Sequence, residues 1–368
     1  MKLMQGSGGD FIRIPTILTA PDGKCYAFAN VRVGTSADNA AETKIIFSMR
    51  SPEGEWTAPR IIASRPGWAY SSGAPVCDES TGKIMYFFRK SAVVLNEFGN
   101  KVTPEQRAEL ARQKEAECGD REGSYILETF DGISFSERKI EIEPLIDPRI
   151  HYPTGSRGST HGSSAGITLK YGQYAGRLVI PARLSIHKVD TWADLMTGSS
   201  NTVLYSDDHG DSWKTGGIVE PGTGEGTLAE RSDGSIYYNS RAYFNDKRRH
   251  EATSTDGGLT FTGQRIIDDL IESCCNACMI RVERGGKVLF FFANPNSETE
   301  RIDMSVKVST DEGESWRLLE VIDNRKSGYS GIIYDRKSDS LLVMYEAGET
   351  SYIDEIALTA VPLSRFNF

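Results

Sequence analysis

The sequence is poor in the residues that build metal, disulfide and thiol sites. It contains 5 His and 6 Cys among 368 residues, which are too few cysteines for a disulfide scaffold of that length. Cys274, Cys275 and Cys278 lie close together, but a zinc site of this type requires a matching second pair of ligands. We therefore interpret these three residues as buried thiols in a strand.

The sequence also lacks an excess of basic charge and any long hydrophobic run. Its 42 Lys and Arg are outnumbered by 51 Asp and Glu, which gives a net charge of −9. Binding to nucleic acid requires clustered Lys and Arg, so we exclude that partner class. The start, Met1–Gly6, has no apolar core of signal-peptide length, and no window is long enough to span a membrane. Location stays open between the cytoplasm and secretion after removal of a signal, and oligomeric state is equally open.

Glycine and aromatic residues are abundant, and they accompany a repeated motif. The sequence has 36 Gly, 15 Tyr, 15 Phe and 5 Trp, which suits many short strands joined by tight turns. The skeleton Ser-x-Asp-x-Gly-x-Ser/Thr-aromatic begins at Ser206, Ser254 and Ser309. From Asp208 to Asp256 is 48 residues, and from Asp256 to Asp311 is 55. These intervals lie in or near the range of propeller blades.

Each copy of the motif predicts a hairpin turn in which the Asp accepts backbone N–H groups and the Gly adopts a positive φ. Shortened copies occur at 51–56 and 130–135. Three clear copies, two shortened copies and a final blade closed by the two termini predict an all-β, six-bladed β-propeller. We expect a single domain over residues 1–368, with a two-sheet sandwich as the alternative.

Residues 101–117 interrupt the pattern of strands. Val102-Thr103-Pro104 resembles a capped helix start, and residues 108–117 are strong helix formers. We interpret this segment as a short helical insertion in one blade.

Residues that could perform chemistry lie away from the repeats. Arg13 and Arg241 stand in strands that are otherwise poor in charge, and Arg301 follows the turn 294–297. Most arginines are surface residues, but three that converge would bind a carboxylate through bidentate hydrogen bonds. Spacing alone does not distinguish Asp38, Glu225 and Tyr329 from ordinary turn residues or half-buried aromatics.

Taken together, these motifs resemble the exo-sialidases (neuraminidases) of bacterial and animal type, over nearly the whole chain. Residues 11–15 resemble the Arg-Ile-Pro motif of that family, and the three repeats resemble its Asp boxes. Asn239-Ser240-Arg241, Gly328-Tyr329-Ser330 and Tyr345-Glu346 follow in the family order. Asp boxes occur in unrelated propellers, but the ordered set is highly specific.

The resemblance implies a role for each matching residue. Arg13, Arg241 and Arg301 match the triad that binds the sialic acid carboxylate, and Glu346 matches the acid that orients Arg13. Asp38 matches the general acid/base, Tyr329 the nucleophile and Glu225 the carboxylate that activates it. A further pocket arginine is matched by Arg32.

These residue types suit the chemistry that the family performs. Sialic acid carries a carboxylate on its anomeric carbon, which would repel an anionic nucleophile. A neutral tyrosine avoids this repulsion but needs a base, since a phenol has a pKa of about 10. The resemblance therefore implies a glycoside hydrolase that retains configuration through a sialyl-tyrosine intermediate and needs no metal or organic cofactor. Its expected partners are sialylated glycoproteins, glycolipids and oligosaccharides.

The sequence departs from the family at the ring-substituent side of the pocket. Relatives often carry Asp or Asn near the position of Ser72, so the identity of the sugar stays open. A trans-sialidase or intramolecular trans-sialidase would use the same residues, with Trp68, Tyr70, Tyr152 and Trp192 as possible wall residues. A non-catalytic sialic-acid-binding propeller is the alternative from another class.

Overall fold

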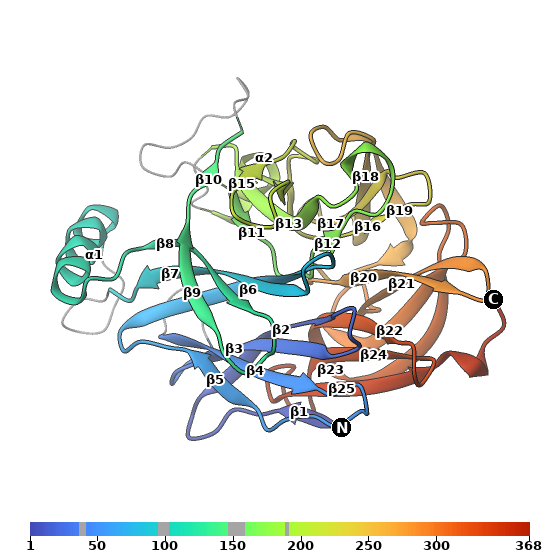
Figure 1. Cartoon of the computed structure of the whole chain (residues 1–368), viewed down its shortest axis with the longest axis horizontal. Helices are drawn as coiled ribbons and strands as arrows, with labels where there is room; N and C mark the ends of the chain where they lie inside the picture. Colours follow the sequence, from blue (N-terminus) through green and yellow to red (C-terminus); the bar gives the residue numbers. More distant parts are fainter. Residues whose placement is uncertain (37–41, 95–102, 146–158, 188–190) are drawn as a thin grey trace.

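The computed structural model describes residues 1–36, 42–94, 103–145, 159–187 and 191–368. Within these ranges the chain is all-β, with four hydrogen-bonded sheets and two α-helices (Figure 1). The predicted fold class is confirmed at this level. Asp38 and Tyr152 lie outside the described residues.

The first two sheets contain the N-terminal half of the chain, and their strands pair mostly with their sequence neighbours. The first sheet comprises β2 (Phe11–Thr19), β3 (Cys25–Arg32), β4 (Thr43–Arg50), β5 (Arg60–Ala63), β6 (Trp68–Asp78), β7 (Lys83–Ala92), β8 (Gly123–Thr129) and β9 (Ser136–Ile140). The second comprises β10 (Ile142–Glu143), β11 (Ser159–His161), β12 (Ile167–Thr168), β13 (Leu178–Ser185), β14 (Ser199–Ser206) and β15 (Trp213–Thr215).

The other two sheets contain the C-terminal half. The third is an antiparallel meander of β16 (Thr223–Glu230), β17 (Ile236–Ala242), β18 (Arg248–Ser254) and β19 (Thr262–Ile271). The fourth comprises β20 (Cys278–Arg284), β21 (Lys287–Pro295), β22 (Ile302–Ser309), β23 (Arg317–Asp335), β24 (Ser340–Gly348), β25 (Glu355–Pro362) and β1 (Lys2–Met4). The first and last strands of the chain therefore pair with each other, antiparallel.

Apolar side chains pack each sheet against its neighbours in a circular order. Phe87 of the first sheet meets Trp213 of the second, and Val203 of the second shares a buried cluster with Ile236 of the third. The third and fourth sheets join where Tyr237 contacts Phe290, and a further cluster joins the fourth to the first. This packing places N-terminal strands (blue) beside C-terminal strands (red) (Figure 1).

The repeated motif forms the turns that the sequence predicts. Asp208 accepts hydrogen bonds from the backbone N–H of Ser212 at 2.9 Å and from its hydroxyl at 2.5 Å. Gly210 adopts φ 85°, which glycine tolerates without strain. Trp213 is 1% exposed and donates its indole N–H to the carbonyl of Gly210 at 3.0 Å. The aromatic residue of the motif is therefore buried and packs between two sheets.

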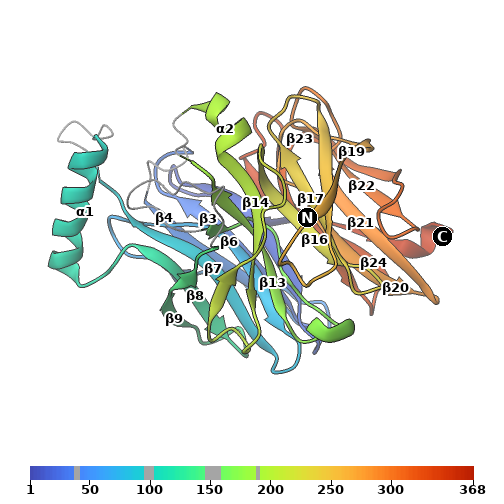
Figure 2. The same cartoon turned by 90° about the horizontal axis from the view of Figure 1, so that it is seen from above.

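The helical insertion is present as α1 (Pro104–Cys118), beside the first sheet (Figure 2). Thr103 caps it with Gln106 in a reciprocal pair of bonds, and Gly119 ends it at φ 74°. The Lys114 ammonium donates to the carbonyl of Gly67 at 2.5 Å, which holds the helix against the chain before β6. A second helix, α2 (Trp192–Gly198), was not predicted from the sequence.

Replacement of Asp208 by Ala should lower stability without weakening substrate binding. Partial burial opposes ionisation, but the bonds from Ser212 and Ser206 outweigh it and lower the pKa of Asp208 to about 2. At neutral pH we expect the free energy of unfolding to fall by about 1 kcal/mol. This loss is smaller than that typical of hydrogen bonds to charged groups, because solvent screens an exposed turn. Urea denaturation measures this.

The pH dependence has a definite sign, because the folded pKa of Asp208 is depressed from its ordinary value of 3.8. The stability difference between Asp208→Ala and wild type should be complete above pH 4 and shrink as pH falls toward 2. Asp211→Ala in the same turn is the control and should behave as wild type. A raised KM in folded Asp208→Ala would contradict a purely structural role.

Candidate active site

A buried carboxylate, Glu346 on β24, connects the two ends of the chain beneath the candidate site. It is fully buried, and its Oε1 accepts from the Nε of Arg13 at 2.6 Å and from the backbone N–H of Ile14 at 2.9 Å. Its Oε2 accepts from the backbone N–H of Tyr329 at 3.0 Å. Glu346 therefore fixes the Arg13 side chain and the local backbone of both β2 and β23.

The Arg-Ile-Pro segment has an unusual backbone at this point. Ile14 adopts φ 59°, a left-handed conformation that is costly for a β-branched residue, and the register between β2 and β3 shifts between Arg13 and Thr16. The bond from Ile14 to Glu346 and the burial of the Ile14 side chain stabilise this bulge. The bulge points Arg13 toward Tyr329.

Glu225, Arg241 and Tyr329 form a hydrogen-bonded triangle. The phenol of Tyr329 donates to Oε1 of Glu225, while Nη1 of Arg241 donates to Oε2 of Glu225 at 2.6 Å and to the Tyr329 oxygen at 3.3 Å. Arg241 comes from the end of β17 and Glu225 from β16, whose strands pair with each other. The predicted nucleophile and its predicted base are therefore in contact.

The surroundings lower the pKa of Glu225 and raise that of Tyr329. Burial would raise the pKa of Glu225, but the charge of Arg241 and the bond from Tyr329 outweigh burial and lower it. Burial and the neighbouring Glu225 charge raise the pKa of Tyr329 well above its ordinary value, although Arg241 opposes them. At rest the proton therefore stays on the phenol, hydrogen-bonded to an ionised Glu225.

Arg13 and Arg301 lie over the same aromatic rings. Their guanidinium carbons stand 5.6 and 5.7 Å from the ring centroid of Tyr329, and 5.3 and 5.0 Å from that of Tyr352. With Arg241 at the phenol oxygen, all three predicted arginines converge on Tyr329. Tyr352 was not predicted, because a tyrosine in the turn before β25 carries no signal in the sequence.

A buried ion pair between Arg249 and Glu272 holds the strand that carries Arg241, and this pair was not predicted from the sequence. Arg249 and Glu272 are 0% and 2% exposed in their side chains and 2.7 Å apart. Arg249 also donates to the side-chain oxygen of Asn239 at 2.7 Å, and Glu272 accepts from the backbone N–H of Ala242 at 3.3 Å. The pair therefore holds both sides of Arg241 on β17. β18 begins with the consecutive polar residues Arg248 to Glu251, a run that resembles a solvent-facing segment and hides this role.

The remaining predicted residues stand differently. Arg32 ends β3, is buried, and donates to the carbonyl of Ser36 at 2.6 Å, two residues before Asp38 in the sequence. Ser72 lies in β6, and its side chain lies outside the part of the structure that is described. Of the possible wall residues, Trp68 and Tyr70 are 1% and 3% exposed, so both belong to the core.

The cysteine prediction is fully correct only for Cys278, a buried free thiol at the start of β20. Cys275 is buried as predicted but lies in the turn before β20 rather than in a strand. Cys274 lies in the same turn, is half-exposed and has φ 55°, so the prediction is wrong for it. The described part of the chain contains no cluster of His, Cys, Asp or Glu that could hold a metal ion. In the same part, no helix is long and apolar enough to cross a membrane.

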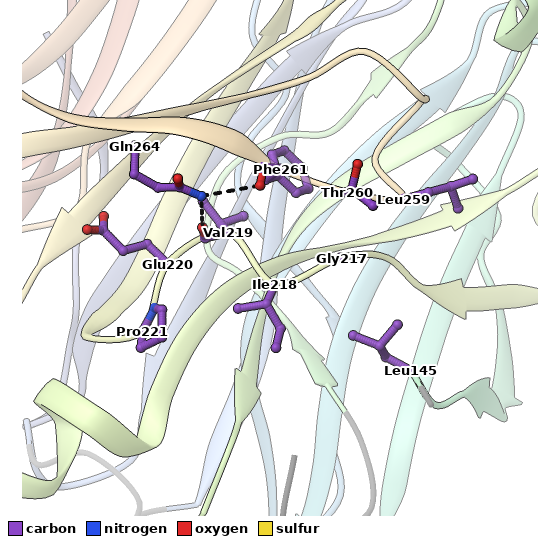
Figure 3. A pocket seen from close by; sticks show the side chains of 10 residues that line it. All are labelled: Leu145, Gly217, Ile218, Val219, Glu220, Pro221, Leu259, Thr260, Phe261 and Gln264. Atoms are coloured by element: carbon purple, nitrogen blue, oxygen red, sulfur yellow. Dashed lines mark hydrogen bonds between the residues drawn. The ribbon is translucent and has the colours of Figure 1, made fainter. Parts of the chain in front are cut away.

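A separate cavity of about 370 Å³ lies between the second and third sheets (Figure 3). Ile218, Val219, Leu259 and Phe261 contribute to its lining, and the Gln264 amide donates to the carbonyls of Val219 and Phe261 across it. None of the predicted site residues lines this cavity, so we do not include it in the candidate site.

Comparison with known proteins places this geometry in context. The family model described as BNR repeat-like domain matches residues 23–344. The sialidase of Micromonospora viridifaciens is 27% identical over 86% of this chain and 47% of its own length, and sialidase-3 of Mus musculus is 23% identical over 94% and 89%. The chain thus spans about half the length of the bacterial relative. The predicted resemblance to bacterial and animal sialidases is confirmed.

Solved structures show the same fold. The Hadza microbial sialidase Hz136 superposes with a TM-score of 0.76 at 23% identity, over 97% of this chain and 66% of the other. A leech intramolecular trans-sialidase superposes with a TM-score of 0.74 at 16% identity, over 99% and 70%.

Replacement of Glu346 by Gln should be strongly destabilising. It removes the charge that pairs with Arg13, and it turns an amide N–H toward groups that are all donors. Loss of one partner from a buried ion pair costs about 3–5 kcal/mol, so we expect a loss of that size in urea denaturation. Glu349→Gln removes a carboxylate that is 80% exposed and 3.9 Å from Arg325, and should change stability by less than about 0.5 kcal/mol. Equal losses in the two variants would contradict the central role of Glu346.

Proposed function

The chain belongs to the BNR repeat-like domain family, and from this premise we propose that it is an exo-α-sialidase that releases terminal sialic acid from glycans. The similarity to curated sialidases of bacteria and mammals supports this proposal. The substrates we propose are sialylated glycoproteins, glycolipids and oligosaccharides.

One observation carries the proposal: the phenol of Tyr329 is bonded to Glu225 within reach of three arginines. Each arginine also keeps a nitrogen with no hydrogen bond or ion pair among the described residues: Nη1 of Arg13, Nη2 of Arg241 and Nη1 of Arg301. Guanidinium groups with unused donors around one point suit a carboxylate ligand. A sialic acid whose carboxylate bound there would have its anomeric carbon, which bears the carboxylate, beside the phenol oxygen.

In the first step that we propose, the Tyr329 oxygen attacks the anomeric carbon, the glycosidic bond breaks, and the phenol proton passes to Glu225. The raised pKa of Tyr329 makes a resting phenolate unfavourable, so proton transfer accompanies attack. Arg241 donates to the Tyr329 oxygen and to Oε2 of Glu225, the carboxylate oxygen that does not receive the proton. It therefore stabilises negative charge on either residue during the transfer.

Asp38 is proposed as the general acid that protonates the leaving oxygen. In the second step it takes a proton from water, which attacks the anomeric carbon as the bond to the tyrosine oxygen breaks. The tyrosine oxygen regains its proton from Glu225. Two displacements give net retention of configuration. Arg32 is proposed as a further pocket arginine and Ser72 as a contact to the ring substituents.

We also propose that residues 1–368 form one six-bladed propeller domain. The third sheet supplies one four-stranded meander, and the longer sheets divide into further antiparallel groups of strands. The 19-residue strand β23 pairs with β22 along its first half and with β24 along its second, so it would serve two blades. Circular packing of the sheets supports closure.

Transfer of the sugar is the second candidate activity. A structural neighbour is a leech intramolecular trans-sialidase that was complexed with 2,7-anhydro-Neu5Ac. NMR of the products separates the two activities, since hydrolysis gives free sugar and intramolecular transfer gives an anhydro sugar. We expect free sugar with the configuration of the substrate as its first form.

Replacement of Tyr329 by Phe should abolish release of 4-methylumbelliferone from its sialic acid glycoside. Loss of the nucleophile should lower kcat by about 10³-fold or more, while the fold persists because the ring remains. Tyr334→Phe lies on the same strand, where its hydroxyl contacts Asp339 at 2.8 Å, and serves as the matched control with near wild-type activity. N-acetyl, N-glycolyl and deaminated sugars should all be assayed. If wild type exceeds Tyr329→Phe on none of them, the proposal fails.

A fluorinated sialyl fluoride should trap the intermediate. Fluorine beside the anomeric carbon slows both steps, and the fluoride leaving group restores the first, so the sugar should remain bonded to the enzyme. Mass spectrometry of peptides should find it on Tyr329 in wild type and on no residue in Tyr329→Phe. A label on Glu225 or Asp38 would contradict the tyrosine mechanism.

A further inference from the structure

The turn between β19 and β20, residues 272–277, lies between two of the proposed carboxylate-binding arginines. The Sγ of Cys274 accepts from the Nε of Arg241 at 3.4 Å. The backbone carbonyl of the same residue accepts from Nη2 of Arg301 at 3.2 Å. One residue therefore contacts Arg241 through its side chain and Arg301 through its main chain.

The sulfur contact determines how Arg241 presents its donors. Nε is directed at Cys274 and Nη1 at Glu225 and Tyr329, which orients the planar guanidinium and leaves Nη2 for a ligand. Without the sulfur, the hydrogen bonds of Nη1 and the packing of the guanidinium over the Tyr243 ring, 5.4 Å from its centroid, would remain, but Nε would lose its acceptor. Cys274 thus acts on the ligand-binding donor indirectly, through Arg241.

Hydrogen bonds from Arg249 hold the turn 272–277 in place. Nη1 of Arg249 donates to the carbonyl of Cys275 at 3.1 Å and to Glu272 at 2.7 Å, so the buried ion pair spans the turn. The side chain of Cys275 is 1% exposed and packs with Ile14 and Tyr329. Any movement of the turn would therefore disturb the Tyr329 ring as well as the arginines.

Backbone conformation does not explain a cysteine at position 274. Its φ of 55° favours glycine and is tolerated by asparagine, whereas cysteine adopts it at a cost. The Sγ also approaches the carbonyl of Ala242 at 3.8 Å, in a direction that lets the thiol donate while it accepts from Arg241. The side chain therefore makes two polar contacts in a backbone conformation that does not favour it.

We propose that Cys274 is a positioning residue for carboxylate binding, which holds Arg241 and Arg301 at the separation that one carboxylate requires. This inference rests on the proposed sialidase function. It concerns binding of the anionic substrate rather than the proton transfer between Tyr329 and Glu225.

Two replacements that share the backbone strain test the proposal. Cys274→Ala removes the polar atom and should raise KM about three- to tenfold with kcat within about twofold, since sulfur is a weak acceptor for a charged donor. Cys274→Ser restores a group that can donate and accept, and should return KM to within about twofold of wild type. Equal KM values for wild type and Cys274→Ala would overturn the proposal, as would equal losses in both variants.

Inhibition by a 2-deoxy-2,3-didehydro sialic acid distinguishes positioning from a general structural effect. The inhibition constant of the free acid should rise in Cys274→Ala in parallel with KM, whereas that of its methyl ester should not change. Equal losses for acid and ester would overturn the proposal. If wild type binds the acid without turnover, calorimetry of the same variants gives the same test. If wild type neither cleaves substrate nor binds the acid, the proposed function itself fails.

A measurement on wild type covers the case in which the variants do not fold. Iodoacetamide should alkylate the half-exposed thiols of Cys274 and Cys118, and peptide mass spectrometry resolves the two. Saturating free acid should slow alkylation of Cys274 and leave Cys118, in α1, as the unprotected reference. Unchanged alkylation of Cys274 in the presence of bound acid would contradict its place beside the carboxylate.

Discussion

The carboxylate of Glu346 is the interaction on which the site depends. It is buried at the centre of contacts from Arg13, Ile14 and Tyr329, and the first two lie more than 300 residues before the third in the sequence. A buried charge is stable only when it is fully paired, so this group favours one arrangement of β2, β23 and β24. The strained backbone at Ile14 persists because the same carboxylate accepts its N–H. Fold and candidate site are therefore stabilised by the same atoms.

Some charged and polar residues around the site hold the three arginines and their strands in place, and others are the proposed ligand-binding groups. Glu346 pairs with Arg13, the Arg249–Glu272 pair holds β17, and Cys274 contacts both Arg241 and Arg301. In the proposed function, the arginine nitrogens that these contacts leave without partners bind the substrate carboxylate, beside the hydrogen bond from Tyr329 to Glu225. Three arginines around Tyr329 make a local positive charge that suits an anionic ligand, although the chain as a whole has a net charge of −9.

The sequence predicted those features that leave a local pattern. The Asp boxes give turns such as that around Asp208, because their bonds lie within a few residues, and α1 follows from its capping box. Arg13, Arg241 and Tyr329 were found through motif order rather than physical spacing. Tyr352, Arg249 and Glu272 leave no pattern, because burial and long-range pairing give them their roles. Cys274 was misread as a buried thiol in a strand, since its left-handed turn is invisible in the sequence.

A crystal structure with bound 2-deoxy-2,3-didehydro sialic acid would test the proposed carboxylate site. We expect the ligand carboxylate to lie within hydrogen-bond distance of Arg13, Arg241 and Arg301 together, with the ring carbon that bears it next to the Tyr329 oxygen. A ligand in the cavity lined by Phe261, or a carboxylate that faces solvent while other groups of the sugar contact the arginines, would contradict this expectation.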